Sequence, residues 1–202
     1  MQTEYQRSKQ ALRVDMLAKR NIMSSEQVLA AGAAIAERVL ASAVYLSAHT
    51  VCSYLAIGNE VPTAPILLAA FAAGKRVILP RTHFAPNRLS LHEIFDLTSL
   101  HTRRYGILEP SPDAPLVRPE DIDLFLIPGS AFDLDGNRLG YGAGFYDMVL
   151  ARNHGCRMAL AYDWQVLPQI PNSAHDVPMD LLVTEYDTHL CRTSIAERLG
   201  QH

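Results

Sequence analysis

Short β-type runs, several of them continuously apolar, restrict this chain to one main kind of fold. They lie at Thr50 to Leu55, Arg76 to Leu79, Leu124 to Ile127, Arg157 to Ala161 and Leu181 to Thr184. A strand that is apolar at successive positions is buried on both faces. Helical patterns separate most of these runs, and helices supply the crossovers that parallel strands need. The sequence therefore predicts an α/β fold with a mainly parallel sheet covered on both faces.

Three helices are expected in the first half of the chain. The first covers residues 4–20, and a capping box at Ser24 to Gln27 opens the second. The third covers Pro62 to Ala73, because its prolines lie only in the first turn and Gly74 provides a stop.

Three basic residues of the first helix, Lys9, Arg13 and Arg20, fall within one narrow stripe at helical spacing. Exposed charges form a solvated face by default, and that is the expectation for this stripe from the residues alone.

Prolines mark the expected ends of two segments. Pro80 is expected to close the strand at Arg76 to Leu79, and residues 109–119 carry four prolines, which is typical of a surface connection. Between them, Leu89 to Ile94 is expected to form an antiparallel strand at the edge of the sheet.

Composition limits the classes of function. Residues 1–202 are expected to form one domain, since 49% are hydrophobic and only 19% are charged. The net charge of -3 gives no general attraction to nucleic acid or anionic membranes. The longest apolar run, Ala64 to Ala73, is too short to cross a bilayer. The three cysteines form no C-x-x-C pair, so we expect reduced thiols in a cytoplasmic protein, which we take to be a monomer.

The glycine-rich segment at residues 128–147 carries the strongest functional signal. It follows an apolar strand and precedes an apolar helical stretch, and Gly140, Gly142 and Gly144 alternate within it. Such a loop can turn backbone N–H groups toward an anion at a helix N-terminus. Arg138 adds a guanidinium suited to phosphate, and Asp147 adds a hard oxygen ligand of the kind that Mg²⁺ prefers.

The segment has other possible interpretations. On the glycines alone, a tight turn is an equally good explanation. The loop lacks the Gly-Lys-Ser/Thr of a Walker motif. A dinucleotide-binding motif beginning at Gly140 would need glycine where Phe145 stands.

The sequence from Arg138 to Asp147, after Pro128-Gly129 and Ala131-Phe132-Asp133, resembles the central motif of the 5-formyltetrahydrofolate cyclo-ligase family. The similarity extends along nearly the whole chain in the family's order. The other matching segments are Lys9 to Arg13, Tyr54-Leu55, Glu60 to Thr63, Leu79 to Arg81, Tyr105 to Pro110 and His175 to Asp180.

This resemblance implies a three-layer α/β sandwich related to sugar-phosphate isomerases and CoA transferases. It also implies a reaction in which 5-formyltetrahydrofolate closes to 5,10-methenyltetrahydrofolate while MgATP becomes ADP and phosphate. The expected partners are therefore two small molecules, a reduced folate and ATP, with Mg²⁺ as cofactor.

The resemblance also assigns roles to residues. Catalytic roles fall on Arg138, Tyr146 and Asp147, and metal binding falls on Asp147 and Asp176. ATP binding falls on Lys9, Gln10, Ala11, Leu12, Arg13, Arg138, Leu139, Gly140, Tyr141, Gly142, Ala143, Gly144, Phe145 and Tyr146. Folate binding falls on Leu55, Glu60, Arg13, Tyr141 and Phe145. Without the family, Glu60 would be read as an exposed loop residue, Leu55 as strand core and Asp176 as a turn residue.

The chain departs from the family pattern within the central motif. Tyr141 and Ala143 occupy positions that are Arg and Lys in some members. Because these two positive charges are missing here, the charge that binds phosphate must come from Arg138, Lys9 and Arg13. Two other functions stay open on the sequence. One is a folate-retaining or ATP-sensing protein with little turnover, and the other is a phosphosugar isomerase or CoA-transferase-like enzyme.

Overall fold

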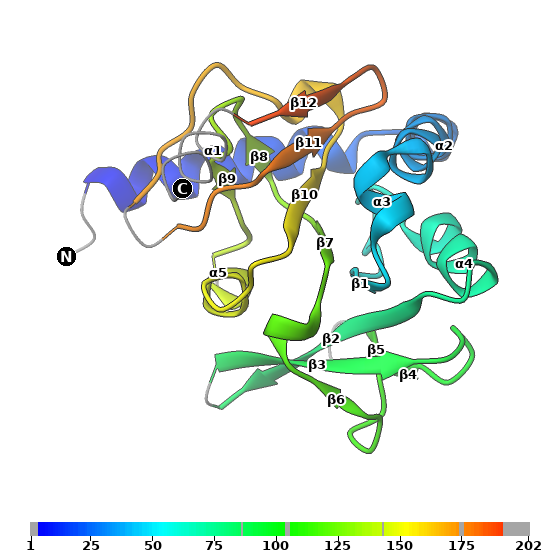
Figure 1. The fold of residues 1–202 in the computed structure, drawn as a ribbon. Helices are drawn as coiled ribbons and strands as arrows, with labels where there is room; N and C mark the ends of the chain where they lie inside the picture. Colours follow the sequence, from blue (N-terminus) through cyan, green and yellow to red (C-terminus); the bar gives the residue numbers. More distant parts are fainter. Residues whose placement is uncertain (1–3, 86, 104–105, 143, 174–175, 192–202) are drawn as a thin grey trace, which may run out of the picture.

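The computed structural model describes residues 4–85, 87–103, 106–142, 144–173 and 176–191. At its centre is an eight-stranded sheet, with five adjacent parallel strands and antiparallel strands at both ends (Figure 1). In spatial order the strands are β12 (Thr188–Leu190), β11 (Leu181–Val183), β10 (Cys156–Leu160), β7 (Leu124–Ile127), β1 (Thr50–Cys52), β2 (Arg76–Phe84), β3 (Asn87–Ile94) and β6 (Leu116–Val117). The mainly parallel sheet expected from the sequence is confirmed.

Helices cover both faces of this sheet, as the apolar strands require. On one face lie α2 (Ser25–Ala41), α3 (Ala43–Ser47) and α4 (Ala64–Ala72), while α5 (Phe145–Leu150) lies on the other (Figure 1). Strand β7 shows why each of its residues must be apolar. Leu124 and Leu126 belong to the core on the α2 face, and Phe125 and Ile127 belong to the core on the α5 face.

The predicted capping box forms at the start of α2. Ser24 Oγ accepts a hydrogen bond from the backbone N–H of Gln27, whose side chain in turn accepts one from the backbone N–H of Ser24. The apolar stripe that follows is buried at Val28, Ile35 and Val39. The cap and the stripe together fix where the helix begins and which side meets the sheet.

Helix α1 (Glu4–Asn21) packs outside the two main cores. It is held by a small cluster in which Met16 contacts Ala131, Leu139 and Ile170. Two of these residues belong to a hairpin formed by β8 (Ala131–Phe132) and β9 (Arg138–Leu139), which interrupts the glycine-rich segment and was not predicted. Consequently α1, from the beginning of the chain, lies over the loop that follows β7.

The solvated basic face expected on α1 is wrong. The side chains of Lys9 and Arg20 are only 12% and 10% exposed, and Arg13 is partly buried. The stripe faces inward because the glycine-rich loop supplies acceptors for Arg13 and Arg20, while the carboxylates of Asp176 and Glu60 pair with Lys9 and Arg20.

Pro80 does not end β2, contrary to expectation. Strand β2 continues to Phe84 and pairs with β3 throughout, whereas its pairing with β1 stops at Ile78. Proline has no N–H, so it ends the parallel ladder on the β1 side and leaves the antiparallel side intact. The last residues of β2 therefore extend past the end of β1.

Two expectations about the region after β2 need correction. Strand β3 is antiparallel as predicted, but it is not the edge of the sheet, because β6 pairs with its outer side. The proline-rich stretch is also not purely a connection, because β6 forms within it. This strand fits between Pro115 and Pro119 and contains no proline itself. The remaining short elements are β4 (His101–Thr102), β5 (Leu108–Glu109), η2 (Pro119–Asp121) and η3 (Asp163–Gln165).

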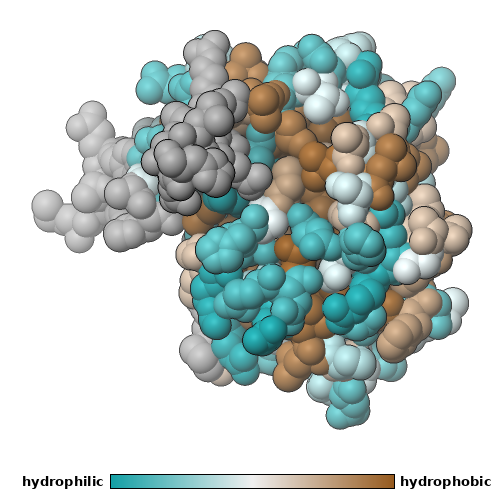
Figure 2. Space-filling model, in the orientation of Figure 1, coloured by the Kyte–Doolittle hydropathy of each residue, from teal (hydrophilic) through white to brown (hydrophobic). Residues whose placement is uncertain are grey.

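Among the described residues, none of the helices is both long and apolar enough to cross a membrane. Hydrophilic and hydrophobic residues are interspersed on the face of the molecule seen in Figure 2.

Candidate active site

A cavity of about 380 Å³ lies at the carboxyl-terminal edge of the parallel strands. Its walls come from the segments that follow β1 and β7, the far end of β2, helix α1 and the glycine-rich loop. Ligand sites of parallel sheets characteristically lie at this edge. The predicted site residues that line it are Lys9, Arg13, Leu55, Glu60, Arg138, Leu139, Gly140, Tyr141, Gly142, Gly144, Phe145, Tyr146, Asp147 and Asp176.

Some predicted residues lie elsewhere. From α1, the described lining residues are Lys9 and Arg13 only. Leu12 packs with the cluster that holds α1, and Gln10 contacts Arg13 through its side chain. Ala11 is exposed. Ala143, together with Tyr105 and His175 of the matching motifs, lies outside the described residues.

Asp133 fixes the turn that presents the glycine-rich loop. Its buried carboxylate accepts hydrogen bonds from the backbone N–H groups of Asn137 and Ile170, at 3.0 Å each. These bonds hold the β8–β9 hairpin closed and aim β9 toward the cavity. Asp133 thus has a structural role within the motif.

The three alternating glycines serve two purposes. Gly142 and Gly144 have φ angles of +104° and +69°, which L-residues with side chains rarely adopt. Gly140 has no such angle, but a Cβ atom there would lie 2.7 Å from Nη1 of Arg138. Gly142 and Gly144 therefore allow the backbone conformation of the loop, and Gly140 leaves space for the guanidinium of Arg138.

Arg138 and Asp147 form one end of the cavity. Nη2 of Arg138 donates to Oδ1 of Asp147 at 3.0 Å, and the guanidinium carbon lies 5.5 Å from the centre of the Tyr146 ring. Burial raises the pKa of Tyr146 well above its usual value, so its hydroxyl remains neutral. The arrangement places a buried positive charge beside a partly exposed carboxylate.

A second ion pair lies at the same end. Nζ of Lys9 donates to Oδ2 of Asp176 at 2.5 Å, and the backbone N–H of Ser173 donates to the same oxygen at 2.9 Å. Burial alone would raise the pKa of Asp176, but the bonds from Lys9 and Ser173 outweigh it and lower that pKa. Asp176 is also next to Val177, whose N–H lies 3.4 Å from Oδ1 of Asp147.

The donor set suits a magnesium ion. The hydrogen bonds of Asp147 described above fall on Oδ1, and those of Asp176 fall on Oδ2, so each carboxylate keeps a second oxygen for other ligands. Among the described residues there is no group of three or more acidic, histidine or cysteine side chains that could enclose a metal. Mg²⁺ is commonly held by one or two carboxylates together with substrate phosphates.

Glu60 lies at the opposite end and is only 6% exposed, so the exposed loop position expected without the family is wrong. Its Oε2 accepts from the backbone N–H of Ile57 at 2.9 Å, and its Oε1 accepts from the hydroxyl of Tyr141. Arg20 pairs with the same Oε1 at 3.7 Å. The loop that contains Glu60 packs against the end of α1, where Asn59 donates to the carbonyl oxygen of Arg20, and this brings Glu60 to the cavity.

Apolar side chains line the part of the cavity between its two ends. Leu55 lines the cavity and packs partly against the core on the α2 face. The ring of Phe145 meets Phe84 edge to face, with 6.2 Å between ring centres. This middle part can accept a flat, largely apolar ligand.

Sequence reasoning missed several residues of the site. Tyr54, Thr82 and Glu109 line the cavity, and Arg20 contacts two of its lining residues. Arg20 had a signal in the sequence, because it shares a helical stripe with Lys9 and Arg13, and Tyr54 and Glu109 lie within segments that match the family.

Comparison with known proteins gives a consistent result. Residues 5–185 match the model of the 5-formyltetrahydrofolate cyclo-ligase family. The chain is 31% identical to the 5-formyltetrahydrofolate cyclo-ligase of Mus musculus, over 88% of this chain and 94% of the relative. It is 32% identical to the enzyme of that name from Escherichia coli strain K12, over 82% of this chain and 94% of the relative.

Two solved structures share the fold. The NMR structure of Aquifex aeolicus 5,10-methenyltetrahydrofolate synthetase superimposes with a TM-score of 0.82 at 33% identity, covering 91% of this chain and 93% of that one. A 5,10-methenyltetrahydrofolate synthetase from Mycoplasma pneumoniae has a TM-score of 0.73 at 23% identity, covering 88% and 98%, and this supports the fold alone.

Proposed function

Because this chain belongs to the 5-formyltetrahydrofolate cyclo-ligase family, we propose that it closes 5-formyltetrahydrofolate to 5,10-methenyltetrahydrofolate while ATP becomes ADP and phosphate. The main support is that one cavity is lined both by the Arg138–Asp147 pair and by Glu60. The Arg138–Asp147 pair suits phosphate groups and their metal ion, and the carboxylate of Glu60 suits the N–H groups of a pterin.

The substrate needs help because a formyl group on nitrogen is amide-like. Donation from nitrogen makes its carbon a poor electrophile and its oxygen a poor leaving group. The attacking N10 belongs to the same molecule, so proximity is already supplied. What remains is activation of the oxygen. In the proposed mechanism the formyl oxygen attacks the γ-phosphorus of ATP and ADP leaves. N10 then adds to the formyl carbon and loses its proton to solvent, and phosphate departs with the oxygen.

The protein's task at the phosphate end is positioning and charge stabilisation. Backbone N–H groups of the loop from Arg138 to Phe145 would surround the phosphates. Arg138 is already oriented by Asp147 and would add a fixed positive charge. Lys9 and Arg13 reach the same cavity from α1, where Arg13 Nε donates to the carbonyl oxygen of Gly140 at 2.8 Å. Charge-assisted hydrogen bonds of this kind contribute about 1.5–3 kcal/mol each.

Asp147 and Asp176 would hold Mg²⁺ through their remaining carboxylate oxygens. When bound, the ion would neutralise charge on the phosphate oxygens. Tyr146 keeps a neutral hydroxyl, and its ring lies against the guanidinium of Arg138 and helps to hold that side chain in place.

At the folate end, the carboxylate of Glu60 would accept hydrogen bonds from the adjacent ring and amino N–H groups of the pterin. Leu55 and Phe145 would contact its faces, with Tyr141 at the side. Because the two ends share one cavity, a folate held at Glu60 would extend its formyl group toward the phosphate site. We also propose that residues 1–202 act as a single-domain monomer in the cytoplasm.

The proposal is tested by following the methenyl chromophore spectroscopically after mixing the protein with 5-formyltetrahydrofolate. Product should form only when both Mg²⁺ and ATP are present, with one phosphate released per methenyl group. Cyclisation at full rate without nucleotide would overturn the proposal. Tight folate binding in a calorimeter with no phosphate release would instead identify a folate-retaining protein.

A further inference from the structure

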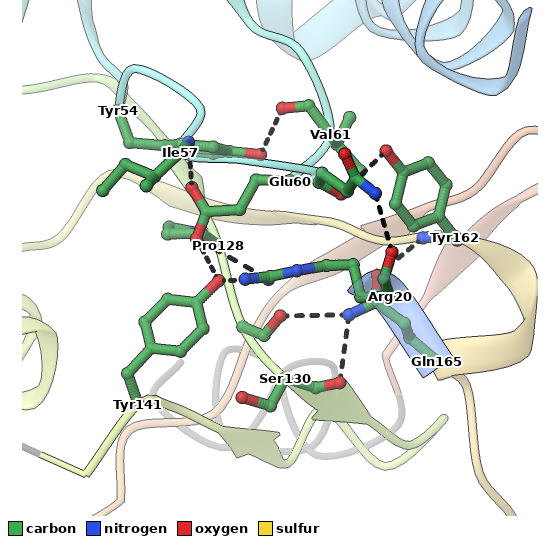
Figure 3. Close-up of polar contacts among 12 residues, drawn as sticks. Arg20, Tyr54, Ile57, Glu60, Val61, Pro128, Ser130, Tyr141, Tyr162 and Gln165 are labelled. Carbon is green, nitrogen blue, oxygen red and sulfur yellow. Dashed lines mark hydrogen bonds and ion pairs between the residues drawn. The ribbon is translucent and has the colours of Figure 1, made fainter. Parts of the chain in front are cut away.

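Arg20 is a buried cation at the folate end of the cavity, in the last turn of α1. Its Nη1 donates to the hydroxyl of Tyr141 at 2.8 Å and lies 3.7 Å from Oε1 of Glu60 (Figure 3). Within the described part of the chain, Glu60 is the only acidic partner of Arg20 and Arg20 the only basic partner of Glu60. A buried charge without its partner is costly, so the two side chains depend on each other.

Tyr141 connects these two charges. Its hydroxyl accepts from Arg20 and donates to Oε1 of Glu60, and the guanidinium carbon of Arg20 lies 5.4 Å from the centre of its ring (Figure 3). Burial around the hydroxyl and the nearby charge of Glu60 raise the pKa of Tyr141. At neutral pH the hydroxyl therefore keeps the proton that it donates to Glu60.

The other oxygen of Glu60 is held by the backbone. Its Oε2 accepts from the N–H of Ile57, and the amide of Asn59 ties this loop to the carbonyl oxygens of Arg20 and Met23 at 3.0 Å each. Each carboxylate oxygen has two lone pairs, so one on each oxygen remains available. The carboxylate is thereby fixed as a pair of acceptors at the cavity wall.

We propose that Arg20 is a positioning residue for folate recognition, which orients the carboxylate of Glu60 through Tyr141 and balances its charge. The inference rests on the proposed function, because it takes the pterin as the ligand of Glu60. Arg20 itself need not touch the folate. It also makes no contact with the Arg138–Asp147 pair, so its removal should weaken folate binding selectively.

The test compares Arg20→Met and Arg20→Lys with Lys19→Met, a control that removes an exposed cation from the same turn of α1. For Arg20→Met we expect KM for 5-formyltetrahydrofolate to rise roughly 10- to 100-fold, the effect of losing one charge-assisted hydrogen bond between a misoriented Glu60 and the folate. KM for ATP should stay within about twofold, since mutations at sites without shared partners act independently. Arg20→Lys should recover part of the folate affinity, and Lys19→Met should behave as wild type.

A double-mutant cycle separates positioning from a general structural role. Calorimetry would measure folate binding, without ATP, to Glu60→Gln, to Arg20→Met and to the double variant. If Arg20 acts through Glu60, adding Arg20→Met to Glu60→Gln should change Kd by less than about threefold. Independent effects of the two substitutions would overturn the proposal, as would equal rises in both KM values.

Two checks keep the result decisive. If circular dichroism shows that Arg20→Met is unfolded, the same cycle is run with Arg20→Lys, where an undiminished folate affinity counts against the proposal. Because calorimetry needs no turnover, a wild-type protein that binds folate without cyclising it would refute the proposed activity and leave the role of Arg20 measurable.

Discussion

Lys9 Nζ lies 2.5 Å from Oδ2 of Asp176, although 167 positions separate the two residues in the sequence. Their ion pair joins helix α1 to the segment before β11, and both residues line the cavity. The pair brings a cation and a carboxylate to the place where we expect the phosphates and magnesium of ATP. Both groups are therefore in position before the nucleotide binds.

Replacing Lys9 with Met should raise KM for ATP roughly 10- to 100-fold, since one charged contact to phosphate is lost. It should also raise the pKa of Asp176, because the bond from Lys9 helps to hold that pKa low. Carboxylate NMR signals would measure the pKa. An unchanged Asp176 pKa would contradict the pairing.

The same pair predicts how stability depends on pH. The pKa of Asp176 is lower in the folded protein than its ordinary value. The stability that the ionised carboxylate adds to the folded state is therefore fully present above the unfolded pKa of about 3.9. That contribution is lost as the pH falls through the folded pKa. The difference in unfolding free energy between wild type and Lys9→Met should thus be constant near neutral pH and shrink below about pH 4. Urea unfolding at pH 7 and pH 3 would measure it.

Asp147→Asn should reduce kcat by about 100-fold or more, because the proposed metal contact, worth several kcal/mol in the transition state, would be weakened. The fold should be retained, since Asp147 is partly exposed and asparagine has the same shape. Single-turnover formation of the methenyl product would measure the effect. Asp113→Asn, in an exposed loop, is the matched control, and an undiminished rate in Asp147→Asn would remove this residue from the metal site.

Gly140→Ala should reduce activity more than stability. Its new Cβ would lie 2.7 Å from Nη1 of Arg138, and the far end of a side chain can move at little cost. Moving it takes the guanidinium away from the phosphate site, so kcat should fall by about tenfold or more. Gly144→Ala provides the contrast in urea unfolding. Its new Cβ would meet no atom of the described residues within 4 Å, but the position has a φ of +69°, so the variant should lose about 1–2 kcal/mol of stability.

Ser24→Ala should lower the free energy of unfolding by about 1 kcal/mol through loss of the α2 cap. The kinetic constants should not change, since Ser24 lies outside the cavity lining. Ser25→Ala, one position further along, is the control, and equal losses from the two variants would contradict the capping role.

Local signals in the sequence predicted much of the fold. The capping box at Ser24 and the apolar run from Leu124 to Ile127 each depend on neighbouring residues, and both are confirmed. Pro80 shows the limit of such reasoning. A missing N–H affects only one side of a strand, and which side matters depends on a partner strand far away in the sequence.

The site was predictable as a set of residues but not as a set of contacts. Family resemblance selected Glu60 and Asp176. The side chains that pair with them, Arg20 and Lys9, both come from α1 and are distant from them in the sequence. The inward side of that helix is apolar only around Met16, so its basic stripe gave no sign of being covered. Arg20 was missed for this reason, although its spacing from Arg13 placed it on the same side.

The position of α1 has a consequence for synthesis of the protein. Helix α1 is translated before the strands of the sheet, but it lines a cavity to which Asp176, translated after β10, also contributes. A nascent chain that stops after β10 would carry the glycine-rich loop without the carboxylate that Lys9 pairs with. The nucleotide binding proposed for this loop would thus depend on completion of the sheet, and unfinished chains would lack part of the proposed phosphate site.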